Sequence, residues 1–231
     1  MAIIHDVAQG SAEWFRVRMG IPTASNFGKI ITPKTGRLSA QAADYAYKLI
    51  AESLLNRPMQ TLDGLQWIER GKDLEPQAVQ QYEFTVEEDT KPVGFITTND
   101  GLIGASPDRL VVGKPIGIEI KCPADWTHIG YLLEGHDDKY RPQVQGQLMV
   151  AELERVDFYS YHDRMPARLI QTYRDEPYIA LICAALAEFN ERMAGMIERA
   201  KSLGVFQAYP SVTTPREAAD ADNLAEQIVV H

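Results

Sequence analysis

Three charged residues near the middle of the chain have the types and spacing of a catalytic cluster. Asp108 follows Pro107, while Glu119 and Lys121 lie two residues apart in an alternating segment. Side chains two residues apart on a strand point to the same face, so Glu119 and Lys121 should lie together. A turn at residues 113–115 would fold Asp108 back beside Glu119. The spacing therefore predicts two carboxylates and one ammonium around a single point.

Such a donor set suits a hard divalent cation. Mg²⁺ and Mn²⁺ prefer oxygen ligands and usually keep several waters, which leaves room for a substrate or a nucleophile. Lys121 could lower the pKa of a metal-bound water or stabilise a developing oxyanion. A purely structural role is also open, because alternating Glu and Lys are ordinary on the solvent face of a strand. The flanking Ile118 and Ile120 favour a buried strand, in which charges need partners or metals.

The surrounding pattern predicts an α/β or α+β fold, a mixed central β-sheet flanked by helices. Helical periodicity and capping residues predict helices over 11–18, 25–31, 39–55, 63–84, 143–154 and 177–203. Ser11 and Ser39 should be N-caps, and Pro76 should kink or break its helix. Alternation between turn residues predicts strands over 93–96, 102–106, 109–112, 116–121, 156–161 and 168–173. We expect one domain over 1–231, divided into N-terminal helices (1–85), a sheet core (86–175) and a C-terminal helix and tail (176–231).

The charge of the chain at first argues against a nucleic-acid partner. The 231 residues carry a formal net charge of −9, whereas nucleic-acid-binding proteins usually have a basic excess. The first sixty residues nevertheless hold seven Lys/Arg against four Asp/Glu, which makes this region locally basic. Two cysteines are too few for a disulfide framework or a structural zinc site, and neither a secretory signal nor a membrane span is indicated. We expect a cytoplasmic protein with no membrane partner.

Five blocks of sequence resemble one known family. In order they are WFRVRMGIPTAS (14–25), RGKDLE (70–75), ASPD (105–108), EIKCP (119–123) and PQVQGQL (142–148). Their order and spacing are similar to those of the phage-type recombination exonucleases, the lambda exonuclease or YqaJ-like family of the PD-(D/E)xK nuclease superfamily. The resemblance implies a restriction-endonuclease-like core, a mixed central sheet flanked by helices.

The resemblance also implies which residues carry the chemistry. The implied catalytic residues are Glu75, Asp108, Glu119, Lys121 and Gln145. Asp108 and Glu119 would bind the metal together with the carbonyl oxygen of Ile120. Glu75 would serve a second metal or its water shell, Lys121 would orient or activate the attacking water, and Gln145 would support the site. Two metals would activate the water and stabilise the leaving oxygen.

A second set of implied residues contacts the DNA: Arg18, Ser25, Ser106, Lys34 and Ile68. Arg18, Ser25 and Ser106 would hold the terminal 5′-phosphate, because a guanidinium offers bidentate donors and hydroxyls add neutral ones. Lys34 would reach the duplex, and Ile68 would help to part the terminal base pairs. Simpler interpretations are that Arg18 is a solvated charge at a helix end and that Ser25 is a helix cap.

The resemblance implies a Mg²⁺-dependent enzyme, with Mn²⁺ as a substitute, that acts on the ends of double-stranded DNA. It would digest the 5′-ended strand and leave 3′ single-stranded DNA for a single-strand annealing protein. The implied assembly is a homotrimeric ring, and the implied setting is a bacterial cytoplasm, with a phage or prophage origin. Two alternatives stay open: a PD-(D/E)xK endonuclease of restriction or structure-specific type, and a DNA-end-binding module with a degenerate site.

Overall fold

The computed structural model describes residues 1–59, 65–136 and 138–209, and for residues 65–72 it describes the backbone alone. Ile68 lies on a helix, but its side chain is outside the described part of the structure. The predicted tail after Ser211 is also outside the described part. Among the described residues, no helix has the combination of length and hydropathy that a membrane crossing requires.

A five-stranded mixed sheet organises the centre of the fold. Its spatial order is β2-β5-β6-β7-β8, in which β6 and β7 are parallel and the other neighbours are antiparallel. The strands are β2 (Thr90–Pro92), β5 (Arg109–Val111), β6 (Ile116–Lys121), β7 (Arg155–Ser160) and β8 (Arg168–Tyr173). A smaller antiparallel sheet of order β1-β3-β4 contains β1 (Ile3–His5), β3 (Phe95–Thr97) and β4 (Gly104–Ala105).

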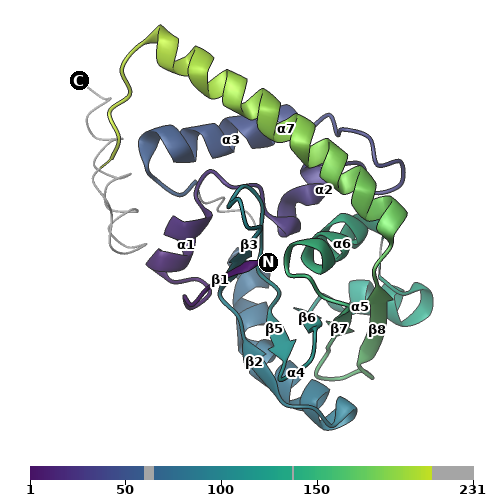
Figure 1. Ribbon diagram of the computed structural model, residues 1–231. Coiled ribbons are helices and arrows are strands. Elements are labelled where there is room, and N and C mark those ends of the chain that lie inside the picture. The colour runs from purple at the N-terminus through teal and green to yellow at the C-terminus, as the bar shows by residue number, and fades with distance from the viewer. Residues whose placement is uncertain (60–64, 137, 210–231) are drawn as a thin grey trace.

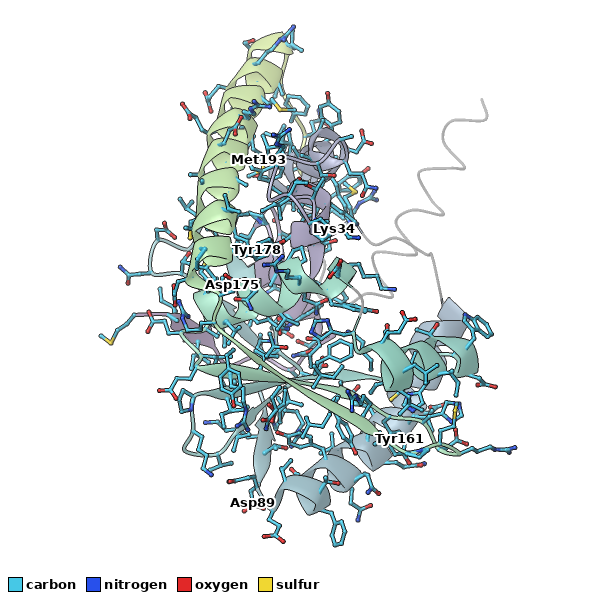
Figure 2. The ribbon with its side chains drawn as sticks, turned by 90° about the vertical axis from the view of Figure 1, so that its right-hand side faces the viewer. Lys34, Asp89, Tyr161, Asp175, Tyr178 and Met193 are labelled. Atoms are coloured by element: carbon cyan, nitrogen blue, oxygen red, sulfur yellow. The ribbon has the colours of Figure 1, made fainter. Side chains whose placement is uncertain are left out.

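Helices cover both faces of the five-stranded sheet. Figures 1 and 2 show α4 (Leu65–Val86) on one side, and α6 (Arg141–Val150) with α7 (Glu176–Leu203) on the other. On the α4 side, Ala78 and Tyr82 pack against Ile118 and Ile120 of β6. On the other side, α6, α7 and α3 (Ala42–Leu55) enclose the largest apolar cluster, together with α2 (Phe27–Ile30). The remaining helices are α1 (Ala12–Arg18), η1 (Ala24–Asn26), α5 (Asp125–Glu134) and η2 (Asp138–Tyr140).

Most of the predicted elements are present, and the differences have local causes. Ser11 caps α1 as predicted, since its side chain accepts a hydrogen bond from the backbone N–H of Trp14. Ser39 does not cap the next helix. Its hydroxyl binds the N–H of Gln41 in a turn, and α3 begins three residues later, at Ala42. Helix α4 continues on both sides of Pro76, so the proline does not break it.

Candidate active site

Strand register brings Asp108 beside β6 as the turn at residues 113–115 predicted. Arg109 pairs with Ile118 across the antiparallel β5–β6 ladder, and the N–H of Asp108 donates to the carbonyl of Ile118 at 3.0 Å. The Asp108 carboxylate then accepts a hydrogen bond from the N–H of Ile120, with Oδ2 2.6 Å from the nitrogen. This bond fixes the carboxylate alongside the end of β6, next to the side chains of Glu119 and Lys121.

Glu119 is buried, with 2% of its surface exposed, and polar side chains surround it. Gln143 donates to Oε1 at 2.6 Å and Gln147 donates to Oε2 at 2.5 Å. These two glutamines lie one helical turn apart on α6, so both amides reach the same strand residue. The ammonium of Lys121 also donates to Oε1. Each carboxylate oxygen of Glu119 therefore has at least one donor, and its orientation is fixed.

The charges of this cluster perturb one another. Burial raises the pKa of Asp108 well above its usual value, and the nearby Glu119 raises it further. Burial alone would lower the pKa of Lys121, but the carboxylates of Glu119 and Asp108 outweigh it and the pKa is raised. Lys121 is consequently a stable cation at neutral pH. Two neighbouring carboxylates with one lysine leave an acidic excess that a bound cation would relieve.

The donor set fits a divalent cation of the Mg²⁺ type. Within the described residues, no three His, Cys, Asp or Glu side chains come together as a metal cluster. The site instead offers two carboxylates, and Mg²⁺ is commonly held by one or two carboxylates while waters complete its shell. The carbonyl of Ile120 belongs to the same strand end as Glu119, which fits its predicted role as a further oxygen ligand.

Glu75 comes to the site from the opposite layer of the fold. It lies on α4, one turn before the buried Ala78, and its side chain is exposed. Its charge acts on Asp108, whose pKa it raises slightly. The structure thus places Glu75 within electrostatic range of Asp108 without bringing it into the hydrogen-bond network of the two carboxylates.

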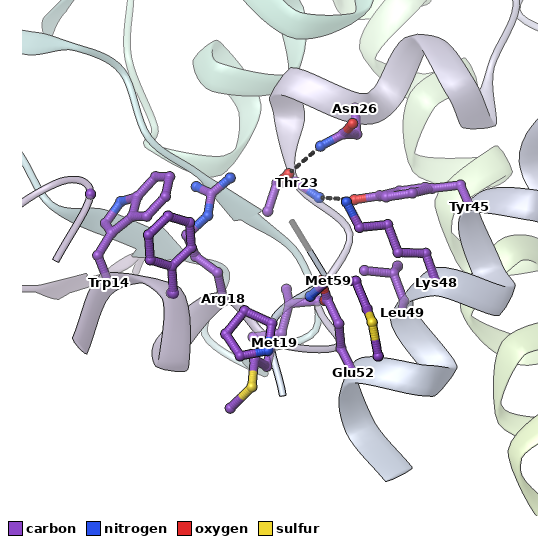
Figure 3. Close-up of a pocket in the computed structure, with 14 residues that line it drawn as sticks. Trp14, Arg18, Met19, Thr23, Asn26, Tyr45, Lys48, Leu49, Glu52 and Met59 are labelled. Atoms are coloured by element: carbon purple, nitrogen blue, oxygen red, sulfur yellow. Dashed lines mark hydrogen bonds between the residues drawn. The ribbon is translucent and has the colours of Figure 1, made fainter. Parts of the chain in front are cut away.

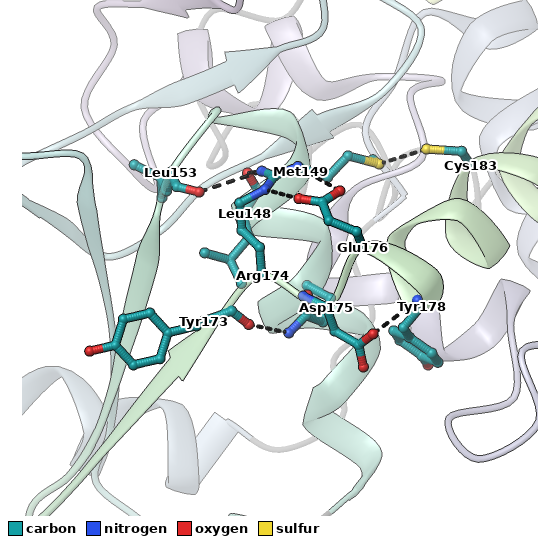
Figure 4. A network of polar contacts seen from close by, with 10 residues as sticks. Leu148, Met149, Leu153, Tyr173, Arg174, Asp175, Glu176, Tyr178 and Cys183 are labelled. Carbon is teal, nitrogen blue, oxygen red and sulfur yellow. Dashed lines mark hydrogen bonds and ion pairs between the residues drawn. The ribbon is translucent and has the colours of Figure 1, made fainter.

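Gln145 differs from its expected position. It is buried, but its amide nitrogen donates to the Tyr173 carbonyl at 2.8 Å and its oxygen accepts from the Asp175 N–H at 2.9 Å. Figure 4 shows Tyr173 and Asp175 at this junction between β8 and α7. The reason is helical geometry, because a residue two positions from Gln143 and Gln147 faces another side of α6. The direct support of Glu119 thus comes from Gln143 and Gln147, which the sequence reasoning did not select.

Arg18 and Ser106 are in direct contact. Nη1 of Arg18 donates to Oγ of Ser106 at 2.9 Å, and the indole nitrogen of Trp14 lies 3.2 Å from the same oxygen. The guanidinium carbon sits 3.9 Å from the centre of the Trp14 ring, a cation–π contact. Burial lowers the pKa of Arg18 to about 10, although Tyr45 and Glu52 oppose the effect. This is a partly desolvated guanidinium held rigidly in place.

Ser25 and Lys34 are less tightly placed. Ser25 is exposed, and its hydroxyl lies 3.3 Å from that of Thr23. Lys34 is 81% exposed in a loop and forms an ion pair with Asp138 at 3.6 Å (Figure 2 labels Lys34). The structure does not bring Ser25 into hydrogen-bond contact with Arg18 or Ser106, so only two of the three predicted phosphate ligands contact each other.

A cavity of about 440 Å³ opens beside Arg18. It lies between α1 and α3, and its polar walls come from Arg18, Thr23, Asn26, Tyr45, Lys48 and Glu52. Figure 3 shows Arg18 and Lys48 reaching toward Thr23 from opposite sides. Neither Lys48 nor Tyr45 was selected from the sequence. The only signal was their position on the predicted helix over 39–55, which has no phosphate-binding motif.

Comparisons with known proteins identify a family and related structures. Residues 13–154 match the YqaJ-like viral recombinase domain. The chain is 32% identical to LHK-Exo, an alkaline exonuclease from Laribacter hongkongensis, over 83% of this chain and 97% of that chain, with a TM-score of 0.74. A structure of LHK-Exo in complex with dAMP gives 32% identity, 84% and 100% coverage, and a TM-score of 0.75. A phage-related exonuclease from Haemophilus somnus shares the fold at 16% identity, over 78% of this chain and 96% of that chain, with a TM-score of 0.63. No curated protein matches the sequence significantly.

Proposed function

The chain belongs to the YqaJ-like viral recombinase family and is a DNA exonuclease, and from this premise we propose that it digests the 5′-ended strand of double-stranded DNA with Mg²⁺. The observation that carries the proposal is the convergence of Asp108, Glu119 and Lys121 at one end of β6. These groups match the needs of phosphodiester hydrolysis: oxygen ligands for a cation and a fixed positive charge beside them.

In this mechanism Asp108, Glu119 and the Ile120 carbonyl would hold the cation, and Glu75 would serve a second ion or its water shell. When bound, such an ion would supply Lewis-acid polarisation of the phosphate and a lower pKa for a water. Glu119 and Asp108 raise the pKa of Lys121 in the metal-free site, and its ammonium would orient the attacking water or stabilise developing negative charge. Gln143 and Gln147 keep the Glu119 carboxylate in one orientation.

The direction of digestion would follow from a second site, which contains Arg18 and Ser106. Arg18 and Ser106 form a preorganised pair that suits a terminal 5′-phosphate, and Ser25 would add a further hydroxyl. Lys34 and Ile68 would contact the duplex and part its last base pairs. A strand bound by its 5′ end would lose nucleotides from that end, and a mononucleotide such as dAMP is the product that this activity releases.

We extend the proposal to the partners that this activity requires. Removal of the 5′-ended strand leaves 3′ single-stranded DNA, which a single-strand annealing protein would bind. A homotrimeric ring around the duplex would keep the enzyme on its substrate, and a bacterial cytoplasm, with the gene in a phage or prophage, would supply Mg²⁺ and DNA ends. Mn²⁺ should replace Mg²⁺, since both accept oxygen ligands.

The test is digestion of a linear duplex labelled at either the 5′ or the 3′ end of one strand, with Mg²⁺ present or chelated. Early release of the 5′ label, with none when the metal is chelated, is the expected result. Early release of the 3′ label would contradict the direction. A covalently closed circular duplex is the matched control, and cutting of an unnicked circle would show an endonuclease instead.

A further inference from the structure

The cavity beside Arg18 contains a second cation that the proposed site does not use. Lys48, on α3, lines the cavity from the wall opposite α1. Among the described residues, its ammonium has no hydrogen-bond or ion-pair partner, although it is only half exposed. Burial lowers the pKa of Lys48, and the nearby charges of Lys29 and Arg18 add to this effect, while Glu52 opposes it. A partly desolvated ammonium that has no hydrogen-bond or ion-pair partner among the described residues leaves room for an anionic ligand.

Arg18 also has donors left for a ligand. Only Nη1 is paired, with Ser106, and the remaining N–H groups of the guanidinium have no hydrogen-bond acceptor among the described residues. A guanidinium carries five N–H donors in a planar fork, which matches the oxygens of a phosphate. The hydroxyl of Tyr45, which accepts from the Thr23 N–H at 3.3 Å, keeps its own proton available as a further donor.

The acidic residue of the cavity does not cancel these donors. Both carboxylate oxygens of Glu52 are engaged by backbone N–H groups, that of Gly20 at 3.1 Å and that of Met59 at 3.0 Å. Burial raises the pKa of Glu52, while its two backbone hydrogen bonds and the charges of Lys48 and Arg18 oppose the shift. Glu52 therefore ties two loops to α3, and Arg18, Lys48 and Tyr45 keep donors for a ligand.

We propose that Lys48 is a specificity-determining residue that, together with Arg18, binds the 5′-terminal phosphate monoester of the DNA strand in this cavity. The inference rests on the proposed function, which it deepens by adding a second cation to the 5′-end site. A terminal monoester carries more charge than an internal phosphodiester, so two cations on opposite walls favour the end of a strand over its interior. Tyr45 completes the site as a neutral donor.

The test compares binding and digestion of blunt duplexes that differ only in a 5′-phosphate or a 5′-hydroxyl. Binding is measured on metal-free protein in EDTA, so that the readout does not depend on catalysis. Wild-type protein should prefer the 5′-phosphorylated end, and Lys48→Met should reduce this preference by about tenfold, the size expected for a lost charge-assisted hydrogen bond. Lys48→Gln is a second variant with the same expectation, and thermal unfolding reports whether each is folded.

Lys29→Met is the matched control. Nζ of Lys29 lies 5.6 Å from the centre of the Tyr45 ring, at an exposed helix position that does not line the cavity. Lys29→Met therefore removes the same charge as Lys48→Met from a position close to the cavity but outside it. The inference predicts an unchanged preference in this variant. Equal losses in the Lys29 and Lys48 variants, or an equal loss on both kinds of end in Lys48→Met, would overturn it.

The inference and the proposed function fail in different ways. If wild-type protein digests 5′-phosphate and 5′-hydroxyl ends at the same rate, the phosphate site is wrong and the exonuclease stands. If wild-type protein leaves linear duplex intact with Mg²⁺, or cuts closed circles, the proposed function itself is wrong.

Discussion

Replacing Gln147 by leucine should weaken metal binding without unfolding the protein. Gln147 donates to Oε2 of the buried Glu119 at 2.5 Å, while Gln143 and Lys121 donate to Oε1. Leucine has nearly the same volume but no donor, so Oε2 loses its hydrogen bond and the carboxylate gains freedom to rotate. Groups that orient a metal ligand are typically worth about 10- to 100-fold in metal affinity. At about 1.4 kcal/mol per tenfold, the expected loss is roughly 1.4–2.7 kcal/mol.

The free energy of unfolding of metal-free Gln147→Leu should change much less than its metal affinity. The loss of a donor to a charged acceptor costs about 1.5–3 kcal/mol. Against this, Oε1 of Gln147 is buried with no hydrogen-bond partner among the described residues, and leucine removes that unpaired oxygen. An unpaired buried oxygen itself costs about 1–3 kcal/mol, so the two effects largely cancel in the free energy of unfolding.

Calorimetric titration of Mn²⁺ or Mg²⁺ into DNA-free protein measures the affinity directly. Gln145→Leu is the matched control, because Gln145 lies on the same helix but binds the backbone of Tyr173 and Asp175. We expect this variant to lower the unfolding temperature and to leave the metal affinity within about twofold. If Gln145→Leu weakens metal binding and Gln147→Leu does not, the assignment of the supporting role from the geometry is refuted.

Three further changes test the site and the fold. Lys121→Ala should lower the digestion rate at saturating Mg²⁺ by about 10²- to 10⁴-fold, and full activity would contradict its catalytic role. Tyr82→Phe removes the 2.7 Å hydrogen bond to the fully buried Asp157, so chemical denaturation should show a loss of about 1–3 kcal/mol, and an unchanged midpoint would show that the bond is dispensable. Asp175 caps α7, and its hydrogen bonds to Arg141 and the Tyr178 N–H lower its pKa. Its stabilising effect is therefore present above the unfolded-state pKa and lost as the pH falls through the folded-state value, so Asp175→Asn should flatten the acid limb of the stability–pH curve.

The parts of the fold with strong local patterns could be predicted from the sequence. β6 and β8 have the predicted boundaries, Ile116–Lys121 and Arg168–Tyr173, because alternation and flanking turns define them. Helix α5 was not predicted, and its pattern explains why. Trp126 and Leu133 are exposed at 73% and 79%, while His128 is buried, which reverses the usual amphipathic signal.

The residues of the candidate site also divide into those whose positions the sequence predicts and those whose positions it does not. The spacing of Asp108, Glu119 and Lys121 is a short-range property of one hairpin, so the sequence alone predicts their convergence. The choice among the glutamines of α6 depends on how that helix is rotated against β6, which is a tertiary contact. No period in the sequence distinguishes Gln145 from Gln143 or Gln147 when all three are buried or half-buried polar residues.

The net charge of −9 is compatible with a DNA enzyme because the charges are separated in space. Asp108 and Glu119 lie together at the end of β6, where a cation would offset them, whereas Arg18 and Lys48 face a cavity between α1 and α3. Affinity for the length of a duplex requires many phosphate contacts, each of which releases counterions. Two cations at one cavity cannot supply that, but they suit one terminal phosphate. Such a charge distribution favours capture of an end over coating of the duplex.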